Sequence, residues 1–167
     1  SDRTDPVILE RFATKFGFEP MVFDAFDANG VPVYHTNVLM CIGTDIAMIG
    51  TDLIPDVERC NEIAARLQRS GRHIIELRHD QIGRFAGNAL ELQSKSGRIL
   101  AMSTTALASL DPIQRQAIEE RTPIVALDIP NIEMAGGSVR CNLAGIHLAP
   151  RETSPIRHSN GSSWDLK

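Results

Sequence analysis

The sequence has little cysteine, and none of it lies in a recognisable motif. Its three cysteines, Cys41, Cys60 and Cys141, form no C-x-x-C pair, and an odd number leaves one thiol free in any disulfide scheme. We therefore expect neither a structural zinc site nor a disulfide framework.

Long apolar runs are also missing. Polar residues interrupt the longest apolar stretches within about ten positions, whereas a helix that spans a bilayer needs roughly 20 apolar residues. The chain starts without a signal-peptide pattern, and Ser1 in place of Met fits a processed, tagged or truncated chain. We expect a cytoplasmic protein with no membrane partner.

A strong charge of either sign is absent too. Seventeen basic and 21 acidic residues give a net charge of -4, which argues against nucleic acid as a partner and favours a small molecule. With 43% hydrophobic and 23% charged residues among 167, the chain suits one soluble domain. We place this domain at 1–150 and expect an irregular or disordered tail at 151–167, where Ser, Asn and Gly are frequent.

The sequence that is present predicts short strands and helices in a repeated order. A helix at 5–16, a strand at 21–26 and a turn at 27–30 come first. A ββαβ unit follows, and then a second one, with strands, helix and strand predicted at 38–43, 46–49, 55–69 and 73–77, and again at 90–93, 99–102, 111–120 and 124–129. The fold class is therefore α/β.

An asparagine marks the start of each repeated unit. Asn37, Asn88 and Asn142 are spaced 51 and 54 residues apart, which places them at equivalent ends of successive units. Asparagine also favours turns before strands, so chance spacing is the alternative interpretation. If the units surround an axis, His35 and Cys141 converge although 106 residues separate them.

Cys141 has the neighbours that a nucleophilic thiolate needs. Arg140 offers a positive charge, the glycine pair 136–137 can aim backbone amides at an anion, and His35 can act as acid and base. The alternative is that Cys141 is a small buried side chain and His35 a polar residue with ordinary partners. Cys41, in an apolar run, and Cys60, in a predicted helix, are interpreted as structural.

These stretches together resemble the guanidino-group-modifying enzymes of the pentein, or α/β propeller, fold, which include arginine deiminase, dimethylarginine dimethylaminohydrolase and the amidinotransferases. They look closest to the branch named for citrulline utilisation. The resemblance covers roughly residues 3–151 and is carried by Val22-Phe23-Asp24-Ala25, Val33-Tyr34-His35-Thr36-Asn37-Val38-Leu39-Met40, Phe85-Ala86-Gly87-Asn88, Ile129-Pro130-Asn131-Ile132-Glu133 and Gly136-Gly137-Ser138-Val139-Arg140-Cys141.

The resemblance implies a covalent mechanism without metal or organic cofactor. Cys141 would attack the guanidinium carbon of an arginine-like or citrulline-like compound, and His35 would protonate the leaving nitrogen and later activate water. Asn37, Gly137 and Arg140 would bind substrate. Asn37 stands where deiminases commonly have an aspartate, and a neutral amide cannot pair with the guanidinium charge in the same way.

The resemblance further implies an incomplete propeller of about two and a half to three modules, because the family has five and its early modules supply acidic residues. We therefore predict that this chain is inactive, or nearly so, unless another chain supplies them. We also expect a homo-oligomer. The alternatives are an amidinotransferase, which the same two residues would serve, and a non-catalytic propeller fragment whose exposed sheet edges drive self-association.

Overall fold

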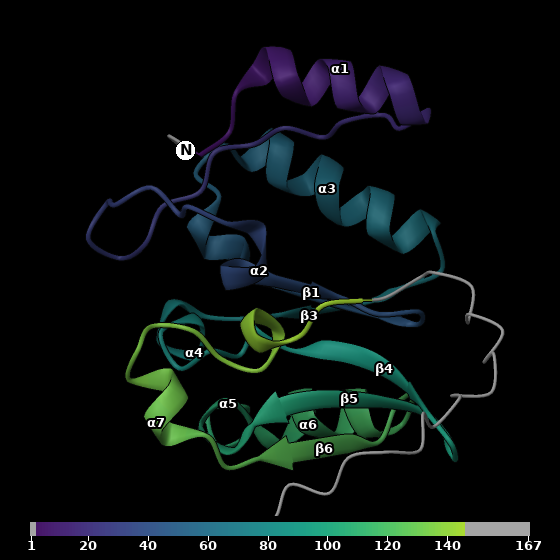
Figure 1. Ribbon diagram of the computed structural model, residues 1–167, viewed down its shortest axis with the longest axis vertical. Helices are drawn as coiled ribbons and strands as arrows, with labels where there is room; N and C mark the ends of the chain where they lie inside the picture. Colours follow the sequence, from purple (N-terminus) through teal and green to yellow (C-terminus); the bar gives the residue numbers. More distant parts are fainter. Residues whose placement is uncertain (1–2, 146–167) are drawn as a thin grey trace, which may run out of the picture.

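The computed structural model describes residues 3–145, which form an α/β fold with helices and strands in close alternation (Figure 1). Two 3-10 turns, Thr51–Leu53 (η1) and Arg140–Asn142 (η2), complete it. The helices and strands are α1 (Pro6–Phe16), α2 (Thr36–Leu39), β1 (Met40–Ile42), β2 (Ile46–Ile49), α3 (Val57–Arg69), β3 (His73–Glu76), α4 (His79–Ile82), β4 (Leu90–Ser94), β5 (Gly97–Ser103), α5 (Thr104–Leu107), α6 (Pro112–Glu119), β6 (Ile124–Leu127) and α7 (Pro130–Glu133).

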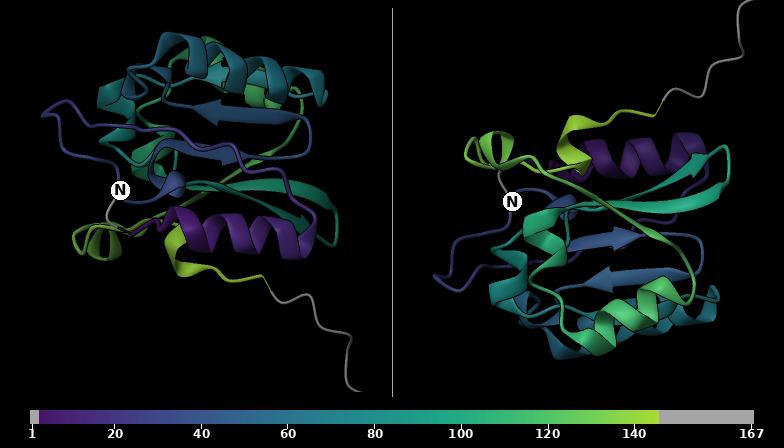
Figure 2. Two further views of the ribbon diagram at one scale, coloured as in Figure 1. Left: turned by 90° about the horizontal axis from the view of Figure 1, so that it is seen from above. Right: turned by 90° about the horizontal axis from the view of Figure 1, so that it is seen from below.

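The chain contains two modules whose sheets have the same topology. In the first module β2 pairs antiparallel with β1 and parallel with β3, and in the second module β5 pairs antiparallel with β4 and parallel with β6. Helices α3 and α6 make the parallel crossovers and lie on one side of the molecule, while α1 lies on the opposite side (Figure 2). The predicted ββαβ repeat is confirmed for these two units.

The third unit that the repeat predicts from Asn142 lies mostly outside the described residues. Arg140–Asn142 form the 3-10 turn η2, and the described residues end three residues later, at residue 145. Within residues 3–145 neither sheet closes on itself, so the ring of modules stays an expectation. The predicted tail at 151–167 lies outside the described residues.

The helix ends follow local side-chain chemistry. The Asp5 carboxylate accepts a hydrogen bond from the Ile8 N–H, and Gly17 ends α1 in the left-handed conformation, with φ of 70°. Asp111 and Gln114 form a capping box at the start of α6. These contacts are the physical reason that both helices begin where the sequence predicted.

Two predicted strands differ in the structure. Residues 21–26 form no strand, because their only ladder contact is an isolated bridge from Phe26 to Pro32 that closes the 27–30 turn. The strand predicted from Val38 starts at Met40, because the His35 ring caps the four-residue helix α2 that precedes it. This short helix is what orients the start of the first module.

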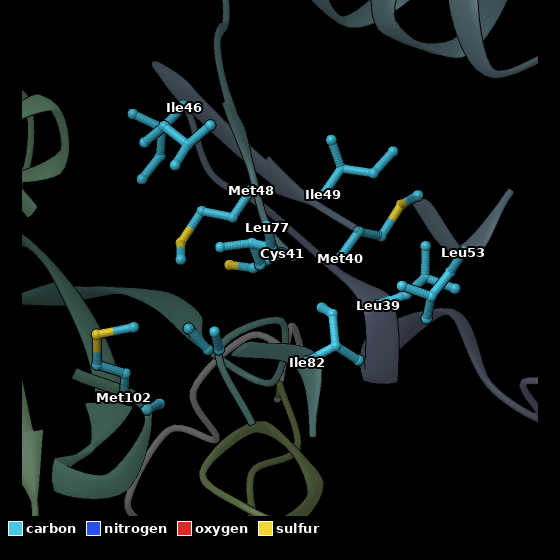
Figure 3. Close-up of a cluster of buried hydrophobic side chains, with 14 of the residues drawn as sticks. Leu39, Met40, Cys41, Ile46, Met48, Ile49, Leu53, Leu77, Ile82 and Met102 are labelled. Carbon is cyan, nitrogen blue, oxygen red and sulfur yellow. The ribbon is translucent and has the colours of Figure 1, made fainter. Parts of the chain in front are cut away.

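The hydrophobic core lies between the two modules. All four residues of β2 are buried, and Cys41, Met48 and Leu77 pack at the centre of the cluster, with Met102 reaching in from the second module (Figure 3). Helix α1 contributes only Ala13, and it leaves four large apolar side chains exposed: Val7, Ile8, Phe12 and Phe16. The core therefore fixes the modules to each other and leaves α1 loosely attached.

The backbones of the two modules lie very close together at Gly87. A Cβ atom on Gly87 would lie 2.5 Å from the Val38 carbonyl oxygen and 2.8 Å from the Leu39 carbonyl carbon. No side chain fits there without moving backbone. A glycine at 87 thus allows the start of the second module to lie against the start of the first.

Candidate active site

The starts of the modules meet at the sulfur of Cys141, in the turn η2. The side-chain amide of Asn88 donates to this sulfur at 3.2 Å, and the side-chain amide of Asn37 donates to it at 3.6 Å. N–H donors stabilise negative charge on sulfur, the charge that a thiolate nucleophile carries. Asn37, Asn88 and Cys141, near the equivalent module ends that the repeat predicts, therefore lie in contact with one another.

Asn88 is the residue that joins the three segments. It is 4% exposed, and its amide nitrogen also donates to the Asn37 carbonyl at 3.0 Å. Its side-chain oxygen accepts from the Cys141 N–H at 3.4 Å, and its backbone carbonyl accepts from the Arg140 N–H at 3.3 Å. Every polar group of this buried side chain is used, so its position is strongly determined.

The chain geometry just before Asn88 is unusual. Phe85 has a φ of 66°, in the left-handed region that a bulky side chain seldom adopts and that costs of order 1–3 kcal/mol. Hydrogen bonds from the Ala86 N–H to the Gln81 carbonyl, at 3.0 Å, and from the Asn88 N–H to the Phe85 carbonyl, at 2.8 Å, hold this conformation. This strained turn places the Asn88 side chain beside the Cys141 sulfur.

His35 is linked to the sulfur through Asn37. Its Nδ1 atom accepts a hydrogen bond from the Asn37 N–H at 3.2 Å, and the Asn37 side chain in turn reaches Cys141. Since Nδ1 is an acceptor, the proton of the neutral ring lies on Nε2. Asn37 therefore connects His35, in a defined tautomer, to the Cys141 sulfur.

His35 and Cys141 line two different cavities. Cys141 borders one of about 210 Å³, together with Phe85 and Asn88, whereas His35 borders one of about 420 Å³ that also includes Asp24. Tyr34 lines both cavities. The histidine and the cysteine thus face adjoining spaces and not one shared pocket.

The other two predicted binding residues are placed by the same turn. A Cβ atom on Gly137 would lie 3.1 Å from the Cys141 Cβ and 3.5 Å from its sulfur, so Gly137 packs directly against the nucleophile. Arg140 contributes its backbone N–H to Asn88, but it does not line the Cys141 cavity. Burial raises the pKa of the Cys41 thiol, and the positive charge of Arg140 offsets a part of that rise.

The model of the family described as N,N dimethylarginine dimethylhydrolase, eukaryotic, matches residues 1–148. The chain belongs to this family. The match confirms the resemblance to guanidino-group-modifying enzymes that the sequence motifs predicted. No curated protein matches the chain.

Solved structures of ArgZ, an arginine dihydrolase from the ornithine-ammonia cycle in cyanobacteria, share the fold. The apo enzyme has a TM-score of 0.63 and 15% identity over 83% of this chain and 20% of its own. Its N-terminal domain bound to product, and a variant domain covalently bound to a reaction intermediate, each have a TM-score of 0.60 and 17% identity over 83% of this chain and 46% of theirs. The chain therefore spans less than half the length of these structures.

The other two cysteines of the chain, Cys41 and Cys60, differ from Cys141 in their surroundings. Burial raises the pKa of Cys41 to about 11, which keeps this core thiol protonated and unreactive. Burial, with smaller contributions from Glu76 and Asp52, also raises the pKa of Cys60. Both were predicted to be structural, and Cys141 alone among the three is exposed.

Two absences concern the described part of the chain only. Residues 3–145 contain no group of three or more His, Cys, Asp or Glu side chains placed to hold a metal ion. In the same range no helix is both long enough and apolar enough to cross a membrane.

Sequence reasoning identified Asn88 as a repeat marker but did not assign it to the site. The available signal was the repeat itself, because residues at equivalent module positions converge. The strain at Phe85 and the role of Glu133, described below, have no comparable signal in one sequence.

Proposed function

We propose that this protein hydrolyses a C–N bond of a guanidino or ureido compound of the arginine or citrulline type, through a covalent adduct on Cys141. The observation that carries the proposal is the pair of amide donors, from Asn37 and Asn88, on a sulfur that borders a cavity. Membership of a dimethylarginine hydrolase family supports the guanidino class of substrate.

In the first half of the reaction the Cys141 thiolate attacks the central carbon of the guanidino group, and a C–S bond forms. The electron pair of the C=N bond moves to nitrogen, and the tetrahedral species then expels an amine that receives a proton from His35. In the second half His35 takes a proton from water, hydroxide attacks the same carbon, and the C–S bond breaks to return the thiolate and a ureido product.

His35 has to change its hydrogen bonding to act in this way. A proton on Nδ1 would face the Asn37 N–H, so the protonated ring must release that bond. Rotation of the His35 side chain past Tyr34 would bring the ring from its own cavity toward the Cys141 cavity. We propose that substrate binding triggers this rearrangement.

Binding of the substrate cation is the incomplete part of the site. Among residues 3–145, those lining the Cys141 cavity include no carboxylate, and Asp24 is the carboxylate of the adjoining cavity. Asn37 and Gly137 are proposed to bind the substrate through neutral donors and through close backbone approach, respectively, and Arg140 is proposed to pair with a carboxylate of the substrate. We therefore expect little turnover unless further carboxylates complete the site.

Two measurements test the proposal: ammonia release from arginine and citrulline, and the mass of any adduct trapped on Cys141 by acid quenching. Cys141→Ala should abolish both, and Cys60→Ala, which also removes one thiol, should change neither. Addition of an amine acceptor separates hydrolysis from amidino transfer. Ammonia release that persists in Cys141→Ala would overturn the proposal.

A further inference from the structure

The turn that carries Cys141 is joined to α7 by a short loop that contains two adjacent glycines. The loop contains Gly136 in the left-handed conformation, with φ of 90°, followed by Gly137. Glycines widen the conformations open to a chain. If the Cys141 sulfur is to stay beside the Asn88 amide, a further contact has to hold this loop in place.

The Glu133 carboxylate is connected to the nucleophile through one residue. Its Oε1 accepts a hydrogen bond from the Ser138 hydroxyl at 2.7 Å. The Ser138 carbonyl then accepts the Cys141 N–H at 3.1 Å and the Asn142 side-chain amide at 2.7 Å. Ser138 is fully buried, so this short path runs inside the protein.

The same carboxylate is attached to the second module. Burial raises the pKa of Glu133, but hydrogen bonds from the side chains of Ser103, Thr105 and Ser138 outweigh it, and the pKa lies below its usual value. Ser103 is 1% exposed and caps α5 through the Ala106 N–H at 3.0 Å. A carboxylate, with acceptor positions only, suits three hydroxyl donors.

We infer that Glu133 is a positioning residue that fastens the Cys141 turn to α7 through Ser138. Its Oε1 is occupied by the Ser138 hydroxyl, and Glu133 does not line the Cys141 cavity. The inference deepens the proposed function, because it explains how the sulfur is kept beside its amide donors.

The reactivity of the Cys141 thiol tests this without any substrate. The full chain is labelled with iodoacetamide at neutral pH, and each cysteine is followed by peptide mass spectrometry. Glu133→Ala should slow labelling of Cys141 about tenfold, the factor expected when one hydrogen bond to a charged sulfur is lost. Labelling of Cys60 serves as the internal reference, and labelling of buried Cys41 reports unfolding.

Further variants separate positioning from general destabilisation. Glu133→Gln keeps the size and one acceptor oxygen, so it should restore part of the Cys141 labelling rate. Ser138→Ala removes the next link, and combined with Glu133→Ala it should add little, because both changes break one path. Glu119→Ala, which removes an exposed carboxylate paired with Arg115, should leave the rate unchanged.

The outcomes are distinct. If Glu133→Ala unfolds the chain, Glu133→Gln and Ser138→Ala decide. Unchanged Cys141 labelling in folded variants, or fully additive effects of Glu133→Ala and Ser138→Ala, would show that the inference is wrong. Turnover that survives Cys141→Ala would instead defeat the proposed function and leave the positioning role intact.

Discussion

The two modules have the same strand order and pairing, yet their starts differ in chemistry. The first begins with His35, exposed, and Asn37, half-buried; the second begins with Ala86 and Asn88, both buried. An equivalent position in the repeat thus holds a titratable ring in one module and a methyl group in the other.

The starts of the two modules differ in the kind of residue that each presents. The first module presents His35, an exposed side chain that is proposed to exchange protons with the substrate. The second module supplies no such group, but its Asn88 makes bonds to both neighbouring segments. The repeat therefore fixes where each module starts. The residue at that start determines whether the position is suited to proton exchange or to holding the neighbouring segments by hydrogen bonds.

The contact between the modules is broken most strongly by Gly87→Ala. The added Cβ would lie 2.5 Å from the Val38 carbonyl oxygen, so the backbones must separate, and we expect unfolding to become easier by about 3 kcal/mol or more. Urea unfolding measures this. Gly83→Ala is the matched control, since its Cβ meets nothing closer than 3.6 Å, and a large loss there would contradict the explanation.

A second prediction contrasts the core thiol Cys41 with the site thiol Cys141. Above pH 9 the unfolded chain loses the Cys41 proton, whereas the folded chain keeps it until about pH 11. The unfolded state then binds fewer protons, so stability should fall over this window, by about 2 kcal/mol. Urea unfolding at pH 8 and pH 10.5 measures the fall.

Variants assign this fall to one thiol. Cys41→Ala should remove most of the pH dependence, and Cys141→Ala should leave it in place. An equal fall in the Cys41→Ala variant would mean that another group causes it.

A third prediction compares Asn37 with Asn88, which have the same side chain but differ in burial. Asn88→Ala removes the side-chain donor to the Asn37 carbonyl and the nearer amide donor to the Cys141 sulfur, so we expect a loss of about 2 kcal/mol. Asn37→Ala removes only a longer contact to the sulfur from a half-buried side chain, and about 0.5 kcal/mol is expected. Thermal unfolding of both variants checks the order, and equal losses would show that burial does not distinguish the two starts.

Much of the fold could be predicted because its signals are local. Asp5 with Gly17, and Asp111 with Pro112, mark helix ends through contacts within a few residues. The alternating strands and the asparagine spacing then revealed the repeat. Residues 21–26 were predicted wrongly, since an extended apolar segment does not disclose whether a partner strand is present.

The site could be predicted only as far as the repeat and the resemblance reached. The repeat brought Asn37 and Cys141 together, and the resemblance gave His35 and Cys141 their proposed roles. The path from Glu133 through Ser138 depends on the conformation of a loop that contains two glycines, and the position of Cys141 depends on a 3-10 turn. Neither is encoded in local spacing.

Only a small change in stability is expected for His35→Ala, and this makes it a sharp test of the difference between the modules. The ring is exposed, and its contribution to the fold is the single bond that caps α2, so unfolding should change by only about 0.5–1 kcal/mol. If the first start supplies the proton-exchange group, hydrolysis of a Cys141 adduct should nevertheless slow by about 10²–10⁴. The decay of the trapped adduct, followed by mass spectrometry, measures this. Decay at the unaltered rate would move the proton transfer to another group, with Asp24 in the same cavity the first to substitute.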